Sequence, residues 1–310
     1  MEASRLTSPT PVDRTAVAER PARLHAARRL VADYVTLTKP RVQLLLLLTT
    51  VATMEVAGDP SVGLILLTLL GGALSAGGAG AVNHWYDRDI DVRMARTATR
   101  PIPAGRVSPR AALTFGIALA ALSFAELSLT VNVLAAALAL SGFLGYVFVY
   151  TLWLKRATPQ NIVIGGAAGA VPPLVGWAAT RGSIDPAALY LFAIVFYWTP
   201  PHFWALSLLM KDEYAKVGIP MLPVVRGEDE TRRQITLYSA LLVAVTLLPF
   251  AGRLFDGVYA ISAGVLGAAF LTLAVRLQRR PDRRAALRLY LFSLLYLALL
   301  FAAMVADVKL

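Results

Sequence analysis

Runs of about 20 apolar residues recur along the whole chain, and no other sequence feature constrains its fold as strongly. Of the 310 residues, 57% are hydrophobic and only 16% are charged, which is typical of a multi-pass membrane protein. Because lipid satisfies no backbone hydrogen bonds, such runs favour helices. We therefore expect an all-α, multi-pass transmembrane helical bundle with nine spans, at residues 42–57, 62–84, 111–131, 133–153, 161–180, 187–209, 235–252, 257–276 and 286–306.

The polar segment before the first span is expected to form a separate region. Residues 1–36 are interpreted as a polar cytoplasmic N-terminal tail, and residues 37–310 as the nine-span domain. The tail has no apolar stretch with a small-residue cleavage site, so a secretory signal is not predicted. It has more Arg than acid, as transit peptides do, but Glu2, Asp13, Glu19 and Asp33 weaken that interpretation. A bacterial inner membrane is therefore favoured over a mitochondrial inner membrane.

The Lys and Arg residues lie almost entirely on one side of the predicted bundle. Of the 30, all but Arg181, Arg253 and Lys309 fall in the tail or near the loops that follow spans two, four, six and eight. The positive-inside rule places that side in the cytoplasm and the C-terminus outside. Orientation also accounts for the net charge of +11, so no nucleic-acid partner is predicted. The absence of cysteine excludes disulfides and thiolate metal sites.

Acids and arginines crowd together directly after the second span. Asn83, Asp87 and Asp91 are spaced by four, so on a helix their side chains share one face, whereas Asp89 points elsewhere. Such a face suits a diphosphate held through Mg²⁺, which takes a few carboxylates together with phosphate oxygens. Donors to the phosphate could come from Arg93, Arg96 and Arg100. A solvated loop of mixed charge without a ligand is the alternative.

A second polar loop follows span six, on the same side of the predicted bundle. It contains Asp212 and Lys216, again spaced by four. One acid and one lysine could complete a diphosphate clamp with the first loop. Taken alone, this pattern is most often just that of a charged helix end.

Of the three histidines, one lies in the tail and two are candidates for a functional role. His202 lies inside an apolar span, where an ionisable side chain is costly and indicates a functional site, although a hydrogen-bonded packing histidine is the alternative. His84 follows Asn83 and is either a hydrogen-bond partner behind the acidic face or an interfacial residue. His25 lies in the basic tail and is expected to be solvated.

Several motifs occur in an order that resembles the protohaem IX farnesyltransferase (haem O synthase) family, within the UbiA-type intramembrane prenyltransferases. The similarity extends from Leu37 to the end of the chain. The segments that carry it are Lys39 to Arg41, Asn83 to Asp91, Arg100-Pro101, Tyr150-Thr151, Leu154 to Arg156, Pro159 to Gly166, Trp198 to Trp204 and Gly218 to Pro223.

The resemblance implies a UbiA-type fold, with a central cavity capped by cytoplasmic loops, and it assigns roles to individual residues. Mg²⁺ would be the cofactor, with Asn83, Asp87, Asp91 and Asp212 as its ligands. The residues implied for catalysis are Asn83, Asp87, Asp91, Lys155, Asp212 and Lys216. The diphosphate would be bound by Lys39, Arg41, Arg93, Arg96 and Arg100. Apart from the resemblance, the mid-span position and aromatic neighbours of His202 and Trp204 make them candidates for a haem pocket, together with Tyr150 and His84.

The chain departs from the superfamily pattern at two places. The second motif is commonly Asp-x-x-x-Asp, whereas Asp212 is followed here by Lys216, which suggests direct contact of that lysine with phosphate. The spacing Tyr-x-x-x-Lys is also common, but Tyr150 and Lys155 are one residue further apart. The number of metal ions and the role of Tyr150 stay open at this point.

The reaction implied by the resemblance is transfer of a farnesyl group from farnesyl diphosphate to a vinyl group of haem b, giving haem O and diphosphate. Loss of diphosphate would give an allylic cation, the vinyl group would attack it, and water would quench the product cation. A haem A synthase would be a downstream partner. The bilayer itself is the remaining partner expected.

Two alternatives to this reaction are retained. A polyprenyltransferase acting on an aromatic quinone precursor would share the diphosphate site and differ around His202. A membrane transporter or haem carrier belongs to a different class, and would place polar groups near the bilayer midplane. The acids of this chain instead cluster at one surface, which favours the enzyme.

Overall fold

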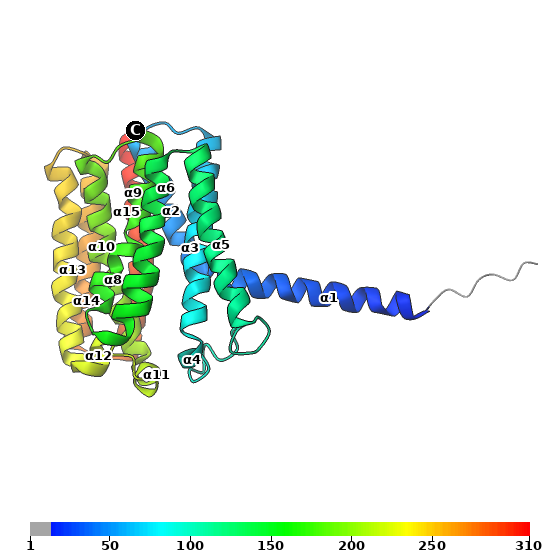
Figure 1. The fold of residues 1–310 in the computed structure, drawn as a ribbon. Coiled ribbons are helices and arrows are strands. Elements are labelled where there is room, and N and C mark those ends of the chain that lie inside the picture. The colour runs from blue at the N-terminus through cyan, green and yellow to red at the C-terminus, as the bar shows by residue number, and fades with distance from the viewer. Residues whose placement is uncertain (1–13) are drawn as a thin grey trace, which may run out of the picture.

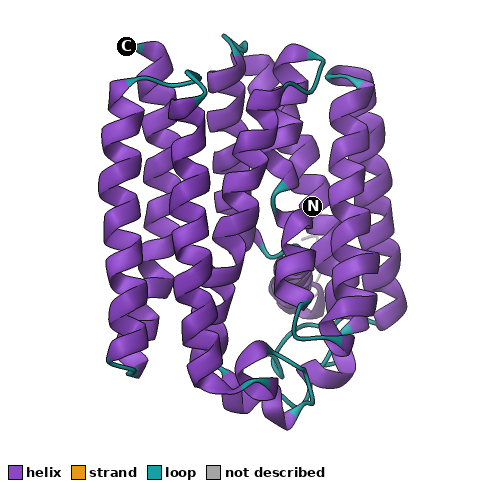
Figure 2. Ribbon diagram, turned by 90° about the vertical axis from the view of Figure 1, so that its left-hand side faces the viewer, coloured by secondary structure: helices purple, strands orange, loops and turns teal. Residues whose placement is uncertain are grey.

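The structure is a computed structural model that describes residues 14–310. The described residues form helices and loops, with no strand among them. The long helices run side by side in a single bundle, as Figures 1 and 2 show. The predicted all-helical bundle is therefore confirmed, while residues 1–13 of the predicted tail lie outside the described residues.

Eight helical segments are long and apolar enough to cross a membrane. They are α2 (Pro40–Ala57), α3 (Val62–Tyr86), α5 (Pro109–Thr130), the joined α6 (Val133–Leu144), η1 (Gly145–Leu154) and α7 (Lys155–Ala157), the joined α8 (Asn161–Gly169) and α9 (Val171–Arg181), α13 (Gly227–Ala251), α14 (Gly257–Arg279) and α15 (Arg283–Lys309).

The remaining predicted span corresponds to α10 (Pro186–Leu209). This helix has 24 residues, and at a rise of about 1.5 Å per residue it is longer than the hydrocarbon core of a bilayer is thick. It packs along α13 and α15 inside the bundle. Pro200, Pro201 and His202 interrupt its apolar run. Its length and its place in the bundle match the span predicted at residues 187–209.

Helix α3 lies unusually close to its neighbours because several of its glycines face other helices. A Cβ atom added at Gly78 would lie 2.6 Å from the carbonyl oxygen of Gly116 in α5, and one at Gly80 would lie 2.9 Å from the carbonyl oxygen of Leu37. Small residues at such crossings permit close approach of two backbones. The glycines therefore fix α3, whose last turn carries Asn83.

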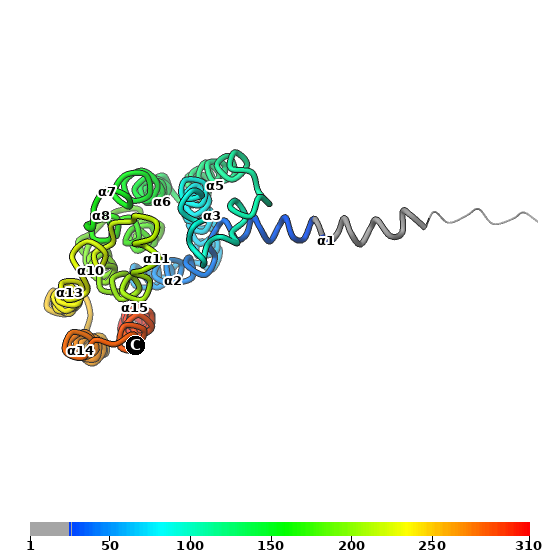
Figure 3. Tube along the Cα trace, turned by 90° about the horizontal axis from the view of Figure 1, so that it is seen from below, coloured from blue at the N-terminus to red at the C-terminus, as the bar shows by residue number. Residues whose placement is uncertain are grey.

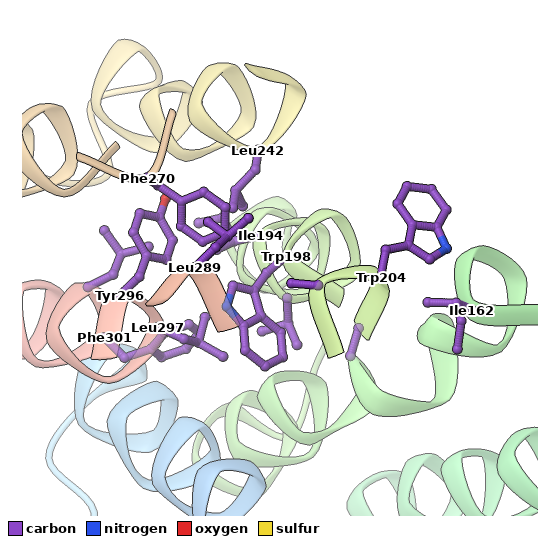
Figure 4. Packing of buried hydrophobic residues seen from close by; sticks show 14 of the residues in the cluster. Ile162, Ile194, Trp198, Trp204, Leu242, Phe270, Leu289, Tyr296, Leu297 and Phe301 are labelled. Atoms are coloured by element: carbon purple, nitrogen blue, oxygen red, sulfur yellow. The ribbon is translucent and has the colours of Figure 1, made fainter. Parts of the chain in front are cut away.

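The other half of the bundle is held by an aromatic core between α10, α13, α14 and α15, part of which is shown in Figure 4. Tyr259, Phe270, Tyr296 and Phe301 are fully buried there. Both tyrosine hydroxyls are satisfied, because that of Tyr296 lies 2.9 Å from Thr246 Oγ1 and that of Tyr259 donates to the Thr246 carbonyl. This half of the bundle is therefore packed mainly from apolar and aromatic side chains, and the acidic residues predicted for the site lie outside it.

Helix α1 (Arg14–Leu37) runs across the direction of the bundle helices (Figure 1). Its end is anchored by Leu37, which is fully buried, and by Asp33, which accepts hydrogen bonds of 2.9 Å from Arg106 Nε. The chain then turns sharply at Lys39, which has φ +55° and precedes Pro40, the first residue of α2. The left-handed conformation is unfavourable for a residue with a side chain, so packing around the turn must hold it.

The short helices gather at one end of the bundle. They are α4 (Arg88–Asp91), α11 (Lys211–Lys216) and α12 (Leu222–Val225), and they lie at the end opposite the C-terminus (Figure 1). Seen from that end, α11 lies over the bundle rather than outside it (Figure 3). The fold thus brings the two polar loops to the same end, as predicted.

Candidate functional site

Asn83 and Asp87 form the centre of a buried polar cluster at the end of α3. Only 3% of Asn83 and 1% of Asp87 is exposed, and Asn83 Nδ2 donates a 2.8 Å hydrogen bond to Asp87 Oδ2. Asp91 is also buried, and its backbone N–H donates to the Asp87 carbonyl, which continues the helical path through α4. Asp89, by contrast, is exposed. The predicted separation of one inward face from Asp89 is confirmed.

Two lysines from distant segments reach this centre. Lys39 Nζ lies 2.5 Å from Asn83 Oδ1, and Lys155 Nζ contacts Asp87 Oδ2. Arg100 donates two hydrogen bonds, of 2.9 and 2.7 Å, to the two oxygens of Asp91. Three cations therefore surround two buried carboxylates, an excess of positive charge that suits a polyanion.

The pKa of Lys39 reflects this excess of positive charge. The pKa of Lys39 is lowered from 10.5 to about 7, chiefly by burial and also by the charges of Arg100 and Lys155, whereas Asp87 and Asp91 act in the opposite direction. A bound anion would favour the charged ammonium. The left-handed turn at Lys39 is what carries this side chain from the α1–α2 junction into the cluster.

The π-helix η1 and the short α7 that follows it contribute side chains to the same cluster. In η1 the N–H of Lys155 donates to the carbonyl of Tyr150, an i to i−5 hydrogen bond that places these residues one turn apart. The unexpected spacing between Tyr150 and Lys155 is therefore accommodated by the wider helix. Tyr150 packs against Gly165 and Tyr146 rather than against the carboxylates.

Three residues of the cluster were not singled out from the sequence. Thr151 Oγ1 accepts from Asn83 Nδ2 at 3.2 Å, and the Tyr146 hydroxyl lies 3.4 Å from Lys39 Nζ. Arg156 pairs with Asp89 at 2.7 Å and lies 3.6 Å from Asp87 Oδ1. Thr151 and Lys155 are spaced by four, which is the signal that could have identified Thr151.

The remaining predicted diphosphate residues lie at the rim. Arg41, Arg93 and Arg96 are exposed. The only one of them with a hydrogen bond in the described part of the chain is Arg93, to the Asp89 carbonyl at 3.4 Å. Of the predicted arginines, Arg100 alone is joined to a buried carboxylate. The role of the other three stays a prediction.

The second polar loop approaches the cluster through a different residue from those predicted. Asp212 and Lys216 are exposed on α11, whereas Tyr214 is half-buried and packs against the apolar cluster that contains Ile90 and Met94 of the first loop. The pKa of Tyr214 is raised mainly by burial, and the charges of Arg96 and Arg100 act against that rise, which indicates their proximity. The structure therefore brings the loops together without joining Asp212 or Lys216 to the first cluster.

The four residues predicted for a haem pocket lie in different surroundings. His202 stacks between Trp198 and Tyr290, at centroid distances of 4.3 and 4.9 Å, and its Nδ1 lies 2.6 Å from Ser293 Oγ. Trp204 packs on Tyr238 instead, and Figure 4 shows Trp198 and Trp204 pointing in different directions. His84 is buried on α3, with no partner for either ring nitrogen among residues 14–310. Their common role in one pocket stays a prediction.

The oxygen donors at the centre suit a hard divalent cation. Asp87 Oδ1 is buried and accepts no hydrogen bond within the described chain, so one carboxylate oxygen is available. Residues 14–310 contain no group of three acidic, histidine or cysteine side chains that could hold a metal by themselves. That composition fits Mg²⁺, which commonly uses one or two carboxylates and completes its shell with water and substrate phosphate.

Comparison with known proteins gives consistent results at the levels of family, sequence and fold. Residues 44–300 match the UbiA prenyltransferase family. The chain is 56% identical over 284 residues to a protoheme IX farnesyltransferase of Chloroflexus aurantiacus, covering 91% of this chain and 48% of that relative. It is 54% identical to that of Symbiobacterium thermophilum, covering 90% and 95%. It thus spans about half the length of the first relative and nearly all of the second.

Two solved structures have the same fold at low sequence identity. A digeranylgeranylglyceryl phosphate synthase superposes with a TM-score of 0.76 at 18% identity, covering 91% of this chain and 100% of that one. A UbiA homolog from Archaeoglobus fulgidus, bound to DMAPP and Mg²⁺, has a TM-score of 0.67 at 19% identity, covering 88% and 99%. These likenesses establish the fold of the bundle.

Proposed function

This chain belongs to the UbiA prenyltransferase family, and on that premise we propose that it transfers a farnesyl group from farnesyl diphosphate to a vinyl group of haem b. The products are haem O and diphosphate. The observation that carries the proposal is the high identity, across almost the whole bundle, to relatives named protoheme IX farnesyltransferase. The cation-rich buried cluster around Asn83 and Asp87 supports it, because that cluster suits a diphosphate.

Mg²⁺ is the proposed cofactor, with Asn83, Asp87 and Asp91 as the residues that would hold it. The free oxygen of Asp87 supports this assignment. When bound, the ion would neutralise part of the charge that develops on the leaving diphosphate. Asp212 is retained as a further candidate ligand on the second loop, and Lys216 as a phosphate contact. Both require α11 to move its exposed side chains toward the substrate.

The side chains of the cluster would then act on the diphosphate itself. Lys39, Lys155 and Arg100 donate hydrogen bonds to its oxygens, and these bonds strengthen as the bond between the farnesyl C1 and the diphosphate oxygen breaks. The vinyl group attacks the allylic cation to form a carbon–carbon bond. Water adds to the product cation and loses a proton, which gives the hydroxyl group. A buried site keeps water from the allylic cation before that attack.

The location proposed for this chemistry is the cytoplasmic face of a bacterial inner membrane. The charge distribution supports that orientation, because most Lys and Arg residues fall in the tail and near the loops at the site end of the bundle. Haem b would approach the cluster from the apolar interior. A haem A synthase is the proposed downstream partner, since it would consume the product.

The proposal is tested with purified protein, haem b, farnesyl diphosphate and Mg²⁺. We expect haem O in the product analysed by mass spectrometry, and loss of product when EDTA removes the metal. Aromatic quinone precursors are included as competing acceptors. Prenylation of such an acceptor in place of haem would contradict the proposed acceptor. Haem binding without diphosphate release would instead indicate a carrier.

Replacing Arg100 with lysine should lower kcat/KM by roughly 10-fold, because lysine keeps the charge but not the planar guanidinium, whose Nη1 donates to both oxygens of Asp91 while its other N–H groups can reach phosphate. Initial rates over a range of farnesyl diphosphate concentrations measure the effect. The control is Arg110→Lys, in an exposed residue of the first turn of α5. Equal kcat/KM in the two variants would show that the guanidinium of Arg100 has no part in the reaction.

A further inference from the structure

A cavity of about 450 Å³ lies between the start of α8 and the helices α10, α12 and α13. None of its lining residues belongs to the cluster around Asn83 and Asp87. We propose that it binds the oxyanion of an amphiphilic ligand, at a site separate from the diphosphate site. The residues that carry the argument are Thr158, Gln160, Trp204, Arg226, Gln234 and Tyr238.

The buried indole of Trp204 is the first observation. Only 2% of Trp204 is exposed, and its Nε1–H has no acceptor in the described chain. A buried indole N–H normally finds a partner, because leaving it without one costs free energy. Its ring is held edge-on against Tyr238, at 5.1 Å between centroids. Figure 4 shows the indole nitrogen on the side of the ring that faces Ile162 of α8, away from the core around Trp198.

The free guanidinium of Arg226 is the second observation. Arg226 lines the cavity and makes no ion pair within residues 14–310. The one acid in the lining is Glu230, and its two oxygens are occupied by Gln234 Nε2 at 2.7 Å and by Arg233 at 3.5 Å. The cavity therefore combines an arginine without an ion pair and a buried N–H without an acceptor in the described chain. Both suit an oxyanion.

The surroundings favour an anion attached to an apolar body. Thr158 and Gln160 precede α8, which begins at Asn161, so the positive end of that helix faces the cavity. Leu222, Trp204 and Tyr238 supply apolar surface in the wall. Along α13, outside the lining, Leu237 and Leu241 are 47% exposed. A carboxylate or phosphate with a hydrophobic remainder fits these features.

The cavity and the diphosphate site are both reached from one short segment, residues 155–160, which joins α7 to α8. Lys155 sends its side chain to Asp87, while its carbonyl accepts from Asn161 Nδ2 at 3.4 Å. Residues 158–160 of the same turn line the cavity. Two sources could supply the oxyanion: a propionate of haem b, which rests on the proposed function, or the phosphate of an anionic lipid, which does not.

The test uses the full-length protein, with Arg226→Gln and Trp204→Phe as variants and Arg284→Gln, an exposed residue at the start of α15, as the control. Haem b and its dimethyl ester are titrated by the shift of the Soret band. Native mass spectrometry measures retention of phosphatidylglycerol against phosphatidylcholine. A lost charge-assisted hydrogen bond should weaken binding by about 10-fold or more.

Weaker binding of haem b in both variants, with the dimethyl ester bound equally by all proteins, would support the propionate. Loss of phosphatidylglycerol in both variants, with haem binding unchanged, would support the lipid. Wild-type binding of both ligands in both variants would overturn the site. Because Arg226 is exposed, its replacement leaves folding intact, which thermal unfolding verifies.

These outcomes are separable from the test of the proposed function. Haem binding that depends on Arg226, in a protein that forms no haem O, would preserve this site and reject the transferase. Haem O formation, with ligand binding unchanged in the Arg226 and Trp204 variants, would instead support the transferase and reject this site. Binding of farnesyl diphosphate with Mg²⁺ is expected to be equal in all the variants, because none of them touches the first cluster.

Discussion

Asp87→Asn should reduce farnesyl transfer by roughly 10²- to 10³-fold, the range for removal of one preorganised electrostatic group. Asp87 joins three elements of the site, because it accepts from Asn83 and Lys155 and keeps one oxygen free for a cation. Asparagine preserves the volume but removes the charge. Product formation under saturating haem b and Mg²⁺ measures the loss, and farnesyl diphosphate titrations show whether binding or chemistry is affected.

The matched control is Asp89→Asn, two residues along the chain. The Asp89 side chain is 55% exposed and pairs with Arg156, so its loss should change the rate only slightly. Removing Asp87 also leaves Lys155 buried beside fewer acceptors, which destabilises the protein. Thermal unfolding of both variants separates that effect from catalysis. Full activity in folded Asp87→Asn would remove this carboxylate from the mechanism.

The inward face of Asn83 and Asp87 could be predicted because it depends only on helical periodicity. The residues stand at the end of a long apolar run, and a spacing of four keeps them together. The same reasoning failed to identify Tyr214 on α11. A helix of six residues can present any face to the bundle, and only tertiary packing selects it. Spacing alone therefore could not decide between Asp212 and its neighbours.

The contribution of η1 and α7 shows a different limit. Predictions from the sequence assume 3.6 residues per turn, whereas Gly145–Leu154 forms a π-helix. The separation of Tyr150 and Lys155 is one residue longer than in the superfamily pattern, and the wider turn accommodates that residue. Lys155, which directly follows the π-helix, contacts Asp87. No local pattern in the sequence indicated a π-helix.

His202 and Trp204 illustrate why neighbouring residues need not share a site. They are two positions apart on α10, so they point about 200° apart around the helix. One packs toward Ser293 of α15, the other toward Tyr238 of α13. Their mid-span position and aromatic neighbours suggested a common pocket. Helical geometry directs them to different neighbours, their shared role stays a prediction, and the cavity next to Trp204 could be found only from the structure.

Gly78→Ala should destabilise the bundle, whereas Gly72→Ala in the same helix should stabilise it. Alanine is favoured over glycine inside a helix by about 1 kcal/mol, and both variants gain this. The new Cβ at position 72 meets only the flexible end of Leu47, at 3.5 Å. At position 78 it would lie 2.6 Å from the Gly116 carbonyl oxygen and 3.2 Å from the Ala120 nitrogen. Both are backbone atoms, so α5 must move.

Such overpacking typically costs about 1–3 kcal/mol. At the upper end of that range, the cost exceeds the gain of about 1 kcal/mol from helix propensity. The melting temperatures of the two purified variants should therefore move in opposite directions from that of the unmodified protein. Activity should fall with Gly78→Ala as well, because displacement of α3 moves Asn83 relative to Lys39 and Thr151. Equal melting temperatures would show that α5 yields freely to α3. The position of the acidic face would then depend on the hydrogen bonds of the cluster, and not on the glycine crossing.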